Sequence, residues 1–142
     1  MPPPEHLPLD AGTVAIQLVI VFALVLANAF FVASEFALVS VRRTRIDQLA
    51  AEGNASARVV QRVVHDLDRY IAATQVGITV ASLALGKVGH DALEPILLPL
   101  FAWIPDGWRG VSQVGVATAF AFAIMTALHV IIGELMPKSI AL

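Results

Sequence analysis

Three apolar stretches of the sequence each carry polar residues at helical spacing. Steps of three, four, seven or eleven residues return a side chain to nearly the same face of an α-helix. The residues with these steps are Gln17, Asn28 and Glu35 in the first stretch, Gln75, Thr79, Ser82 and Gly86 in the second, and Thr126, His129 and Gly133 in the third. Their amide, hydroxyl, carboxylate and carbonyl oxygens suit hard cations such as Mg²⁺, Ca²⁺, Mn²⁺ or Na⁺. The spacing therefore predicts an oxygen-lined cation site where three helices meet.

Two acids, Glu35 and Glu134, lie within these apolar stretches. A charged side chain inside a membrane is costly, so it usually faces other helices or a water-filled cavity and serves a function. Each acid also has a structural interpretation, which the sequence leaves open. Glu35 could form an ion pair with Arg42 at the membrane surface, and Glu134 could be an exposed residue at the end of a helix.

The sequence GELMPK, residues 133–138, closes the third stretch. Pro137 has no N–H group and cannot donate a hydrogen bond to the carbonyl of Gly133, four residues earlier. That carbonyl becomes available as a ligand, and Glu134 supplies a negative charge beside it. The pattern predicts a helix that breaks where an ion needs oxygen ligands, followed by Lys138 at the membrane surface.

The neutral polar residues have structural interpretations as well. Hydroxyl groups in helices often bond to the backbone of their own helix, which is the alternative for Ser34, Thr79, Thr118 and Thr126. Gln17 is best explained by packing, whereas His129 is equally compatible with a hydrogen-bonded bridge between helices and with a place in the site. Ser82 and His129 alone are too weak a pair to indicate an intramembrane hydrolase, so we do not expect an enzyme.

The composition places these stretches in a lipid bilayer. Of the 142 residues, 58% are hydrophobic and 14% are charged, and the mean hydropathy is +0.79. Soluble domains contain about 25% charged residues, so this chain has too little charge to cover a soluble surface. The net charge of −2 points to no nucleic-acid partner. The absence of cysteine excludes disulfides and thiolate metal sites.

The apolar lengths predict an all-α membrane protein in one transmembrane domain, residues 1–142. A membrane span needs about 20 apolar residues. The first and third stretches, 13–41 and 111–133, meet this length, whereas the second, 71–86, is short and is expected to be re-entrant-like. Residues 42–70 should form a belt of cytoplasmic juxtamembrane amphipathic helices, with a break at Gly53 and Asn54. Residues 87–110 should form an outer interfacial segment that carries Trp103 and Trp108.

The distribution of basic residues predicts the orientation of the spans. The residues on the side of the 42–70 segment are Arg42, Arg43, Arg45, Arg58, Arg62, Arg69 and Lys138, against Lys87 and Arg109 on the other side. Basic residues concentrate on the cytoplasmic side of membrane proteins. We therefore expect the N-terminus outside and the C-terminus in the cytoplasm.

Three motifs in order resemble the transmembrane domain of the CorC/cyclin M (CNNM) family of magnesium transport proteins, with bacterial CorC as the nearer type. They are NAFFVASEFALVSVRRTR, RYIAATQVGITVASLALG and HVIIGELMPKSIAL, and the resemblance covers residues 14–142. It implies a homodimer in the bacterial cytoplasmic (inner) membrane with three transmembrane helices, the second re-entrant-like. It also implies Mg²⁺ transport as efflux, with exchange for Na⁺ left open.

By motif match, the resemblance assigns the ion site to seven positions. They are Asn28, Ser34, Glu35, Ser82, Gly86, Gly133 and Glu134. The family continues into cytosolic regulatory modules of the cystathionine-β-synthase type that bind ATP. We expect this chain to be a truncated part without those modules, so no ATP site is assigned to it. The alternative function is a membrane anchor and dimerisation module that transports nothing itself.

Overall fold

The computed structural model describes residues 11–101 and 114–142, which form helices without a strand. The elements in chain order are α1 (Ala11–Ser40), α2 (Arg43–Ala51), α3 (Ala55–His65), α4 (Leu67–Leu97), the 3₁₀ turn η1 (Leu98–Phe101), α6 (Val114–Leu128), the π-helical segment η3 (His129–Leu135) and α7 (Met136–Ala141). Trp103 and Trp108, which the sequence assigns to the outer membrane surface, lie outside the described residues.

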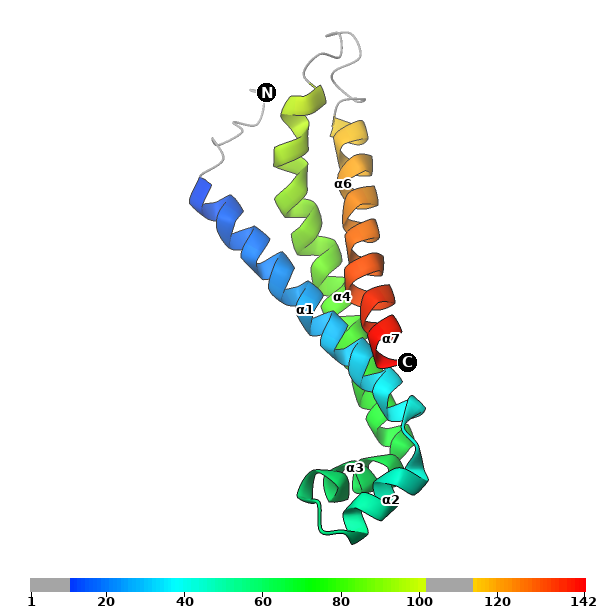
Figure 1. The fold of residues 1–142 in the computed structure, drawn as a ribbon. Coiled ribbons are helices and arrows are strands. Elements are labelled where there is room, and N and C mark those ends of the chain that lie inside the picture. The colour runs from blue at the N-terminus through cyan, green and yellow to red at the C-terminus, as the bar shows by residue number, and fades with distance from the viewer. Residues whose placement is uncertain (1–10, 102–113) are drawn as a thin grey trace.

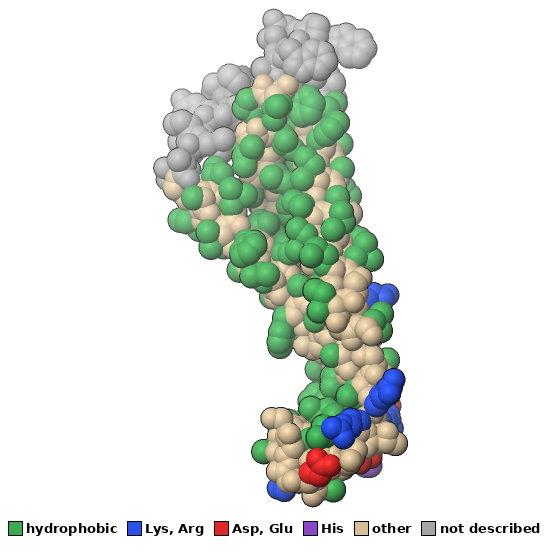
Figure 2. Space-filling view, viewed as in Figure 1, with side chains coloured by type: hydrophobic (Ala, Val, Ile, Leu, Met, Phe, Trp, Pro, Cys, Tyr) green, Lys and Arg blue, Asp and Glu red, His purple; other side chains and the backbone are tan. Residues whose placement is uncertain are grey.

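Three helical stretches are long and apolar enough to cross a membrane. They are Gly12–Ser40, Leu67–Phe101 and Gly115–Ala141. The chain descends through α1, returns through α4 and descends again through α6, η3 and α7, while α2 and α3 form a hairpin beyond one end of the spans (Figure 1). Hydrophobic side chains cover the visible face of the spans (Figure 2). The predicted all-α membrane fold with three spanning helices is confirmed.

The prediction that the second helix is short is wrong. α4 contains 31 residues and extends beyond 71–86 at both ends. Its C-terminal extension carries charged residues four positions apart, and Lys87 Nζ lies 3.3 Å from Asp91 Oδ2. Ion pairs at this spacing stabilise a helix. Charges therefore end the apolar run of the sequence without ending the helix.

The spans pack closely against one another through a buried apolar cluster and a glycine. Val25, Leu85 and Met125 form a buried cluster between α1, α4 and α6. A side chain at Gly77 of α4 would lie 2.7 Å from the ring of Phe31 in α1. The helices are therefore held at distances that larger residues would not permit.

The α2–α3 hairpin turns where the sequence predicts a helix break. Gly53 adopts a φ of 94°, a conformation that residues with a side chain rarely adopt. Asn54 caps α3, because its side-chain oxygen accepts a hydrogen bond of 3.1 Å from the N–H of Ala57. Gln61 Nε2 then donates to Asp47 Oδ1 across the hairpin at 2.8 Å.

The contact between Gly77 and Phe31 leads to a stability prediction. Gly77→Ala should lower the free energy of unfolding in detergent micelles by about 1–3 kcal/mol, because the ring of Phe31 must move. The melting temperature should fall accordingly. Gly86→Ala is the matched control on the same helix, since a Cβ there meets nothing within 4 Å. It should be neutral or stabilising, because alanine favours helix formation by up to about 1 kcal/mol over glycine. Equal melting temperatures for the two variants, followed by circular dichroism, would contradict this packing.

Candidate functional site

The side chain of Asn28 connects all three spans. Asn28 is 0% exposed, and its Nδ2 donates a 3.0 Å hydrogen bond to the carbonyl oxygen of Gly133 in η3. The same nitrogen lies 3.0 Å from Nε2 of His129. Ser82 of α4 completes the cluster, with its hydroxyl 3.5 Å from Asn28 Oδ1 and 3.2 Å from His129 Nε2. Residues from three distant parts of the sequence thus share one polar network inside the bundle.

The hydrogen-bond directions in this network follow from the carbonyl of Gly133. A carbonyl only accepts, so the amide nitrogen of Asn28 must face it, and the second amide hydrogen is directed to His129 Nε2. That nitrogen therefore acts as an acceptor, and the ring proton of His129 resides on Nδ1. Glu134 Oε1 lies 3.6 Å from the same nitrogen. In this arrangement Glu134 is a neighbour of His129 and not its hydrogen-bond partner.

The π-helical segment explains how Gly133 meets Asn28. In an α-helix, the carbonyl of Gly133 would accept from residue 137, but Pro137 has no N–H group. The amide of Asn28 fills this vacancy from α1. The wider turn is seen in the N–H of Met136, which donates to the carbonyl of Ile131, five residues earlier. The prediction of a helix break at GELMPK is wrong, because the chain continues through a π-helical turn into α7.

Four of the seven predicted site residues lie together. They are Asn28, Ser82, Gly133 and Glu134. The hydroxyl of Ser34 instead donates to the carbonyl of Phe30 at 2.7 Å, as in its structural interpretation. Glu35 lies about two turns beyond Asn28 along α1, and it is partly buried. Within the described part of the chain, it forms no ion pair with Arg42.

Gly86, the seventh predicted residue, lies one turn beyond Ser82 at a hollow of about 210 Å³. The other polar residues at this hollow are Ser82, His90, Thr126 and His129. The face of α4 that the sequence predicts does not turn inward along its whole length, since Gln75 and Thr79 are exposed. Figure 1 shows α1 tilted, so that its N-terminal end lies apart from the C-terminal end of α4.

His129 is the central residue that was not among the seven. Its imidazole contacts Asn28 and Ser82 and approaches Glu134. The signal in the sequence was its position four residues before Gly133 on the same helical face. Among the described residues, no group of three or more His, Cys, Asp or Glu could hold a metal ion. The cluster therefore offers a cation mainly neutral oxygens and one carboxylate.

The buried amide gives a second stability prediction. Asn28→Ala should destabilise the protein by about 1–3 kcal/mol, because it leaves the buried carbonyl of Gly133 without its donor. Ser34→Ala is the control on the same helix, since the hydroxyl bonds only to its own backbone, and its effect should stay within about 0.5 kcal/mol. Thermal unfolding in micelles measures both. Similar losses for the two variants would show that Asn28 does not join the helices.

Comparison with known proteins identifies the family. A model of the cyclin M transmembrane N-terminal domain matches residues 18–142. UPF0053 protein YhdT of Bacillus subtilis (strain 168) is 48% identical over 126 residues, which cover 89% of this chain and 27% of that protein. UPF0053 protein YhdP of the same organism is 45% identical over 129 residues, 89% of this chain and 28% of that protein. The chain thus spans about a quarter of the length of these relatives. The resemblance seen in the motifs is confirmed, and this chain belongs to the cyclin M (CNNM) transmembrane domain family.

Proposed function

We propose that this chain is the membrane domain of a Mg²⁺ transporter and that the polar cluster around Asn28 binds the ion. The family is linked to Mg²⁺ transport. The observation that carries the proposal is the fully buried Asn28 amide, which gathers oxygen donors from three spans at one level. A polar group inside the membrane is energetically costly, and such groups usually mark the path of an ion or substrate.

The ion would bind through Asn28 Oδ1, the Ser82 hydroxyl, the Gly133 carbonyl and the Glu134 carboxylate. Mg²⁺ usually keeps several waters and takes one or two carboxylates from the protein. Glu134 suits this role, because its side chain is 44% exposed and can meet a partly hydrated ion. The ion and the Asn28 amide would compete for the Gly133 carbonyl. Binding therefore requires the amide to rotate and release its present hydrogen bond.

The remaining predicted ligands would act in a second position along the path of the ion. Glu35 lies about two turns from Asn28 along α1. Gly86 lines the hollow beside Ser82 and His129. Ser34 would have to leave the carbonyl of Phe30. We further propose efflux as the direction of transport, with Na⁺ as the candidate exchange ion. The regulatory modules that bind ATP would belong to the part of the full-length protein that this chain does not include.

The proposed assembly is a homodimer in the bacterial cytoplasmic membrane. Large apolar side chains such as Phe120 and Phe122 are 54% and 64% exposed on α6 and would face lipid or a second copy. In the second candidate function, the chain is only an anchor and dimerisation module, and the Asn28 network only holds the helices together. The hydrogen bonds between Asn28 and its neighbours are compatible with this alternative. Mg²⁺ binding by the chain distinguishes the two functions.

The charge of Glu134 should be essential for Mg²⁺ binding. Glu134→Gln preserves the shape of the side chain but removes the charge that balances the cation. We expect it to lower Mg²⁺ affinity more than about 100-fold in calorimetric titration, since even residues around a ligand shell typically cost 10–100-fold. Glu94→Gln is the matched control, because this carboxylate lies on the outer part of α4 beside His90. It should bind Mg²⁺ as the wild type does.

Two further outcomes refine this test. Glu35→Gln should weaken binding if Glu35 faces the ion, whereas a lower yield of folded protein would indicate a structural role. His129→Ala should reduce stability more than ion affinity. Equal Mg²⁺ affinity for wild type and Glu134→Gln would place the ion elsewhere, and the absence of binding by the wild type would favour the anchor function.

The proposed orientation can be tested by cysteine labelling, since the chain contains no cysteine. Gly53→Cys, in the α2–α3 turn, should react with an impermeant thiol reagent only after the cells are permeabilised. Asp106→Cys, in the connector outside the described residues, should react in intact cells. The reverse pattern would mean that the arginine-rich hairpin faces outward.

A further inference from the structure

Arginines are concentrated in the α2–α3 hairpin and at its two ends. They are Arg42, Arg43, Arg45, Arg58, Arg62 and Arg69, and all are exposed. Four carboxylates belong to the same segment, namely Asp47, Glu52, Asp66 and Asp68. No ion pair joins the two groups within the described part of the chain. Arg45 donates to Gln48 at 2.9 Å, and Nε of Arg62 donates to the carbonyl of Arg58 at 3.5 Å. The charges of the guanidinium groups are therefore not balanced by these carboxylates and can attract an external anion.

Two adjoining hollows on the hairpin share Arg43. The first has a volume of about 620 Å³ and is also lined by Arg62, His65 and Tyr70. The second has a volume of about 420 Å³ and is also lined by His65 and Arg69. Arg43 therefore lies between two hollows, and each of them contains a second arginine.

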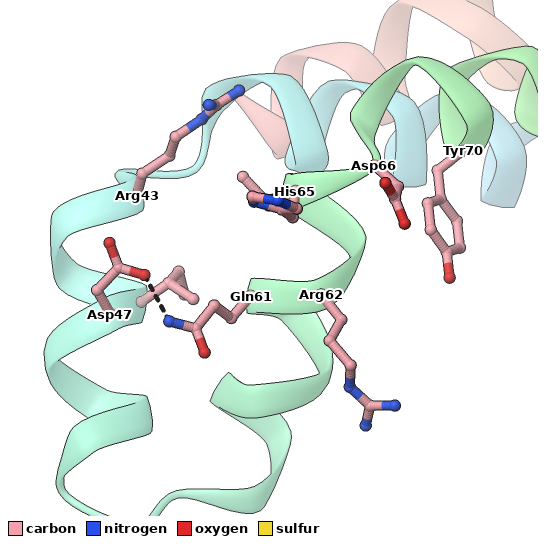
Figure 3. A pocket seen from close by; sticks show the side chains of 9 residues that line it. Arg43, Asp47, Gln61, Arg62, His65, Asp66 and Tyr70 are labelled. Carbon is pink, nitrogen blue, oxygen red and sulfur yellow. Dashed lines mark hydrogen bonds between the residues drawn. The ribbon is translucent and has the colours of Figure 1, made fainter.

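Each hollow is also lined by two acids, Asp47 and Asp66 in the first and Asp66 and Asp68 in the second. Among the described residues, none of these acids forms an ion pair with an arginine. Asp47 accepts the hydrogen bond from Gln61 that ties α2 to α3. Figure 3 shows the guanidinium group of Arg43 directed away from Asp47, and that of Arg62 directed away from Asp66. The guanidinium groups of Arg43 and Arg62 therefore face outward. An arginine presents a planar set of donors that matches phosphate oxygens.

The hairpin also connects the ends of two membrane-spanning stretches. Arg42 and Arg43 lie two and three residues after the end of α1 at Ser40, and Arg69 is in the first turn of α4. Both helices belong to membrane-spanning stretches. Charged side chains gather at this end of the molecule, whereas the spans are covered by hydrophobic groups (Figure 2). A phosphate group at the membrane surface would therefore meet these arginines first.

We propose that the hollows around Arg43 bind the phosphate group of an anionic phospholipid, with Arg62 and Arg69 as the flanking contacts. The aromatic ring of Tyr70 lines the first hollow and suits the boundary between headgroups and acyl chains. Clusters of basic residues next to a membrane span attract anionic lipids. This lipid site is separate from the Asn28 network and does not depend on Mg²⁺ transport.

The test measures how strongly the purified chain retains lipids. Native mass spectrometry counts phosphatidylglycerol and phosphatidylcholine that stay bound after mixing with equal amounts of both. The wild type should prefer phosphatidylglycerol. Arg43→Gln should reduce this preference about fivefold, the ratio for about 1 kcal/mol per arginine near an anionic surface. Arg69→Gln should act in the same direction, and Arg43→Lys should lose less because it keeps the charge.

Arg58→Gln is the matched control, because Arg58 belongs to the same hairpin but lines neither hollow. It should retain the wild-type preference, and circular dichroism should show that all variants fold. An equal loss for Arg58→Gln would mean that diffuse charge, and not the hollows, attracts lipid. Displacement of phosphatidylglycerol by millimolar inorganic phosphate would assign the hollows to a soluble anion. Either result, or a wild type without preference, would overturn the proposal.

Discussion

The hydrogen bond from Asn28 to the carbonyl of Gly133 is the constraint around which the bundle is arranged. A polar atom buried between apolar helices must find a partner, because water is absent. Pro137 creates the unsatisfied carbonyl, and α1 must cross η3 at the level where Asn28 can reach it. Ser82 and His129 then satisfy the rest of the amide. One missing N–H group in the sequence thus leaves a carbonyl that Asn28 satisfies at the point where the helices meet.

The spans themselves follow directly from the sequence. Length and hydropathy identify the first and third crossings, whereas they make the second too short. The break at Gly53 and Asn54 is visible as turn chemistry. The end of α4 could not be found in this way, because the pair formed by Lys87 and Asp91 lowers the local hydropathy while it supports the helix. Hydropathy reports the environment of a segment, whereas the end of a helix depends on its backbone hydrogen bonds.

The cluster was only partly predictable for a different reason. Periodicity shows that Asn28, Ser82 and Gly133 each lie on a polar face, but it does not show at which level the faces meet. That level depends on the tilt of α1. Thr79 lies on the predicted face of α4 but is exposed, and its hydroxyl donates to the carbonyl of Gln75 in its own helix. The role of His129 also depends on this crossing, since its partners come from α1 and α4. Crossing angles arise from the packing of many side chains and have no short signature in a sequence.

The π-helical turn stores a change in helical register. It contains more residues per turn than an α-helix, and Gly133 faces Asn28 only because of it. If this turn tightened to α-helical geometry, α7 would rotate by about 100° relative to α6, the angle of one residue. Lys138 would then leave its place over the ring of Phe36, where its Nζ lies 4.6 Å from the ring centre. A rotation of α7 would therefore determine whether the carbonyl of Gly133 belongs to the Asn28 network.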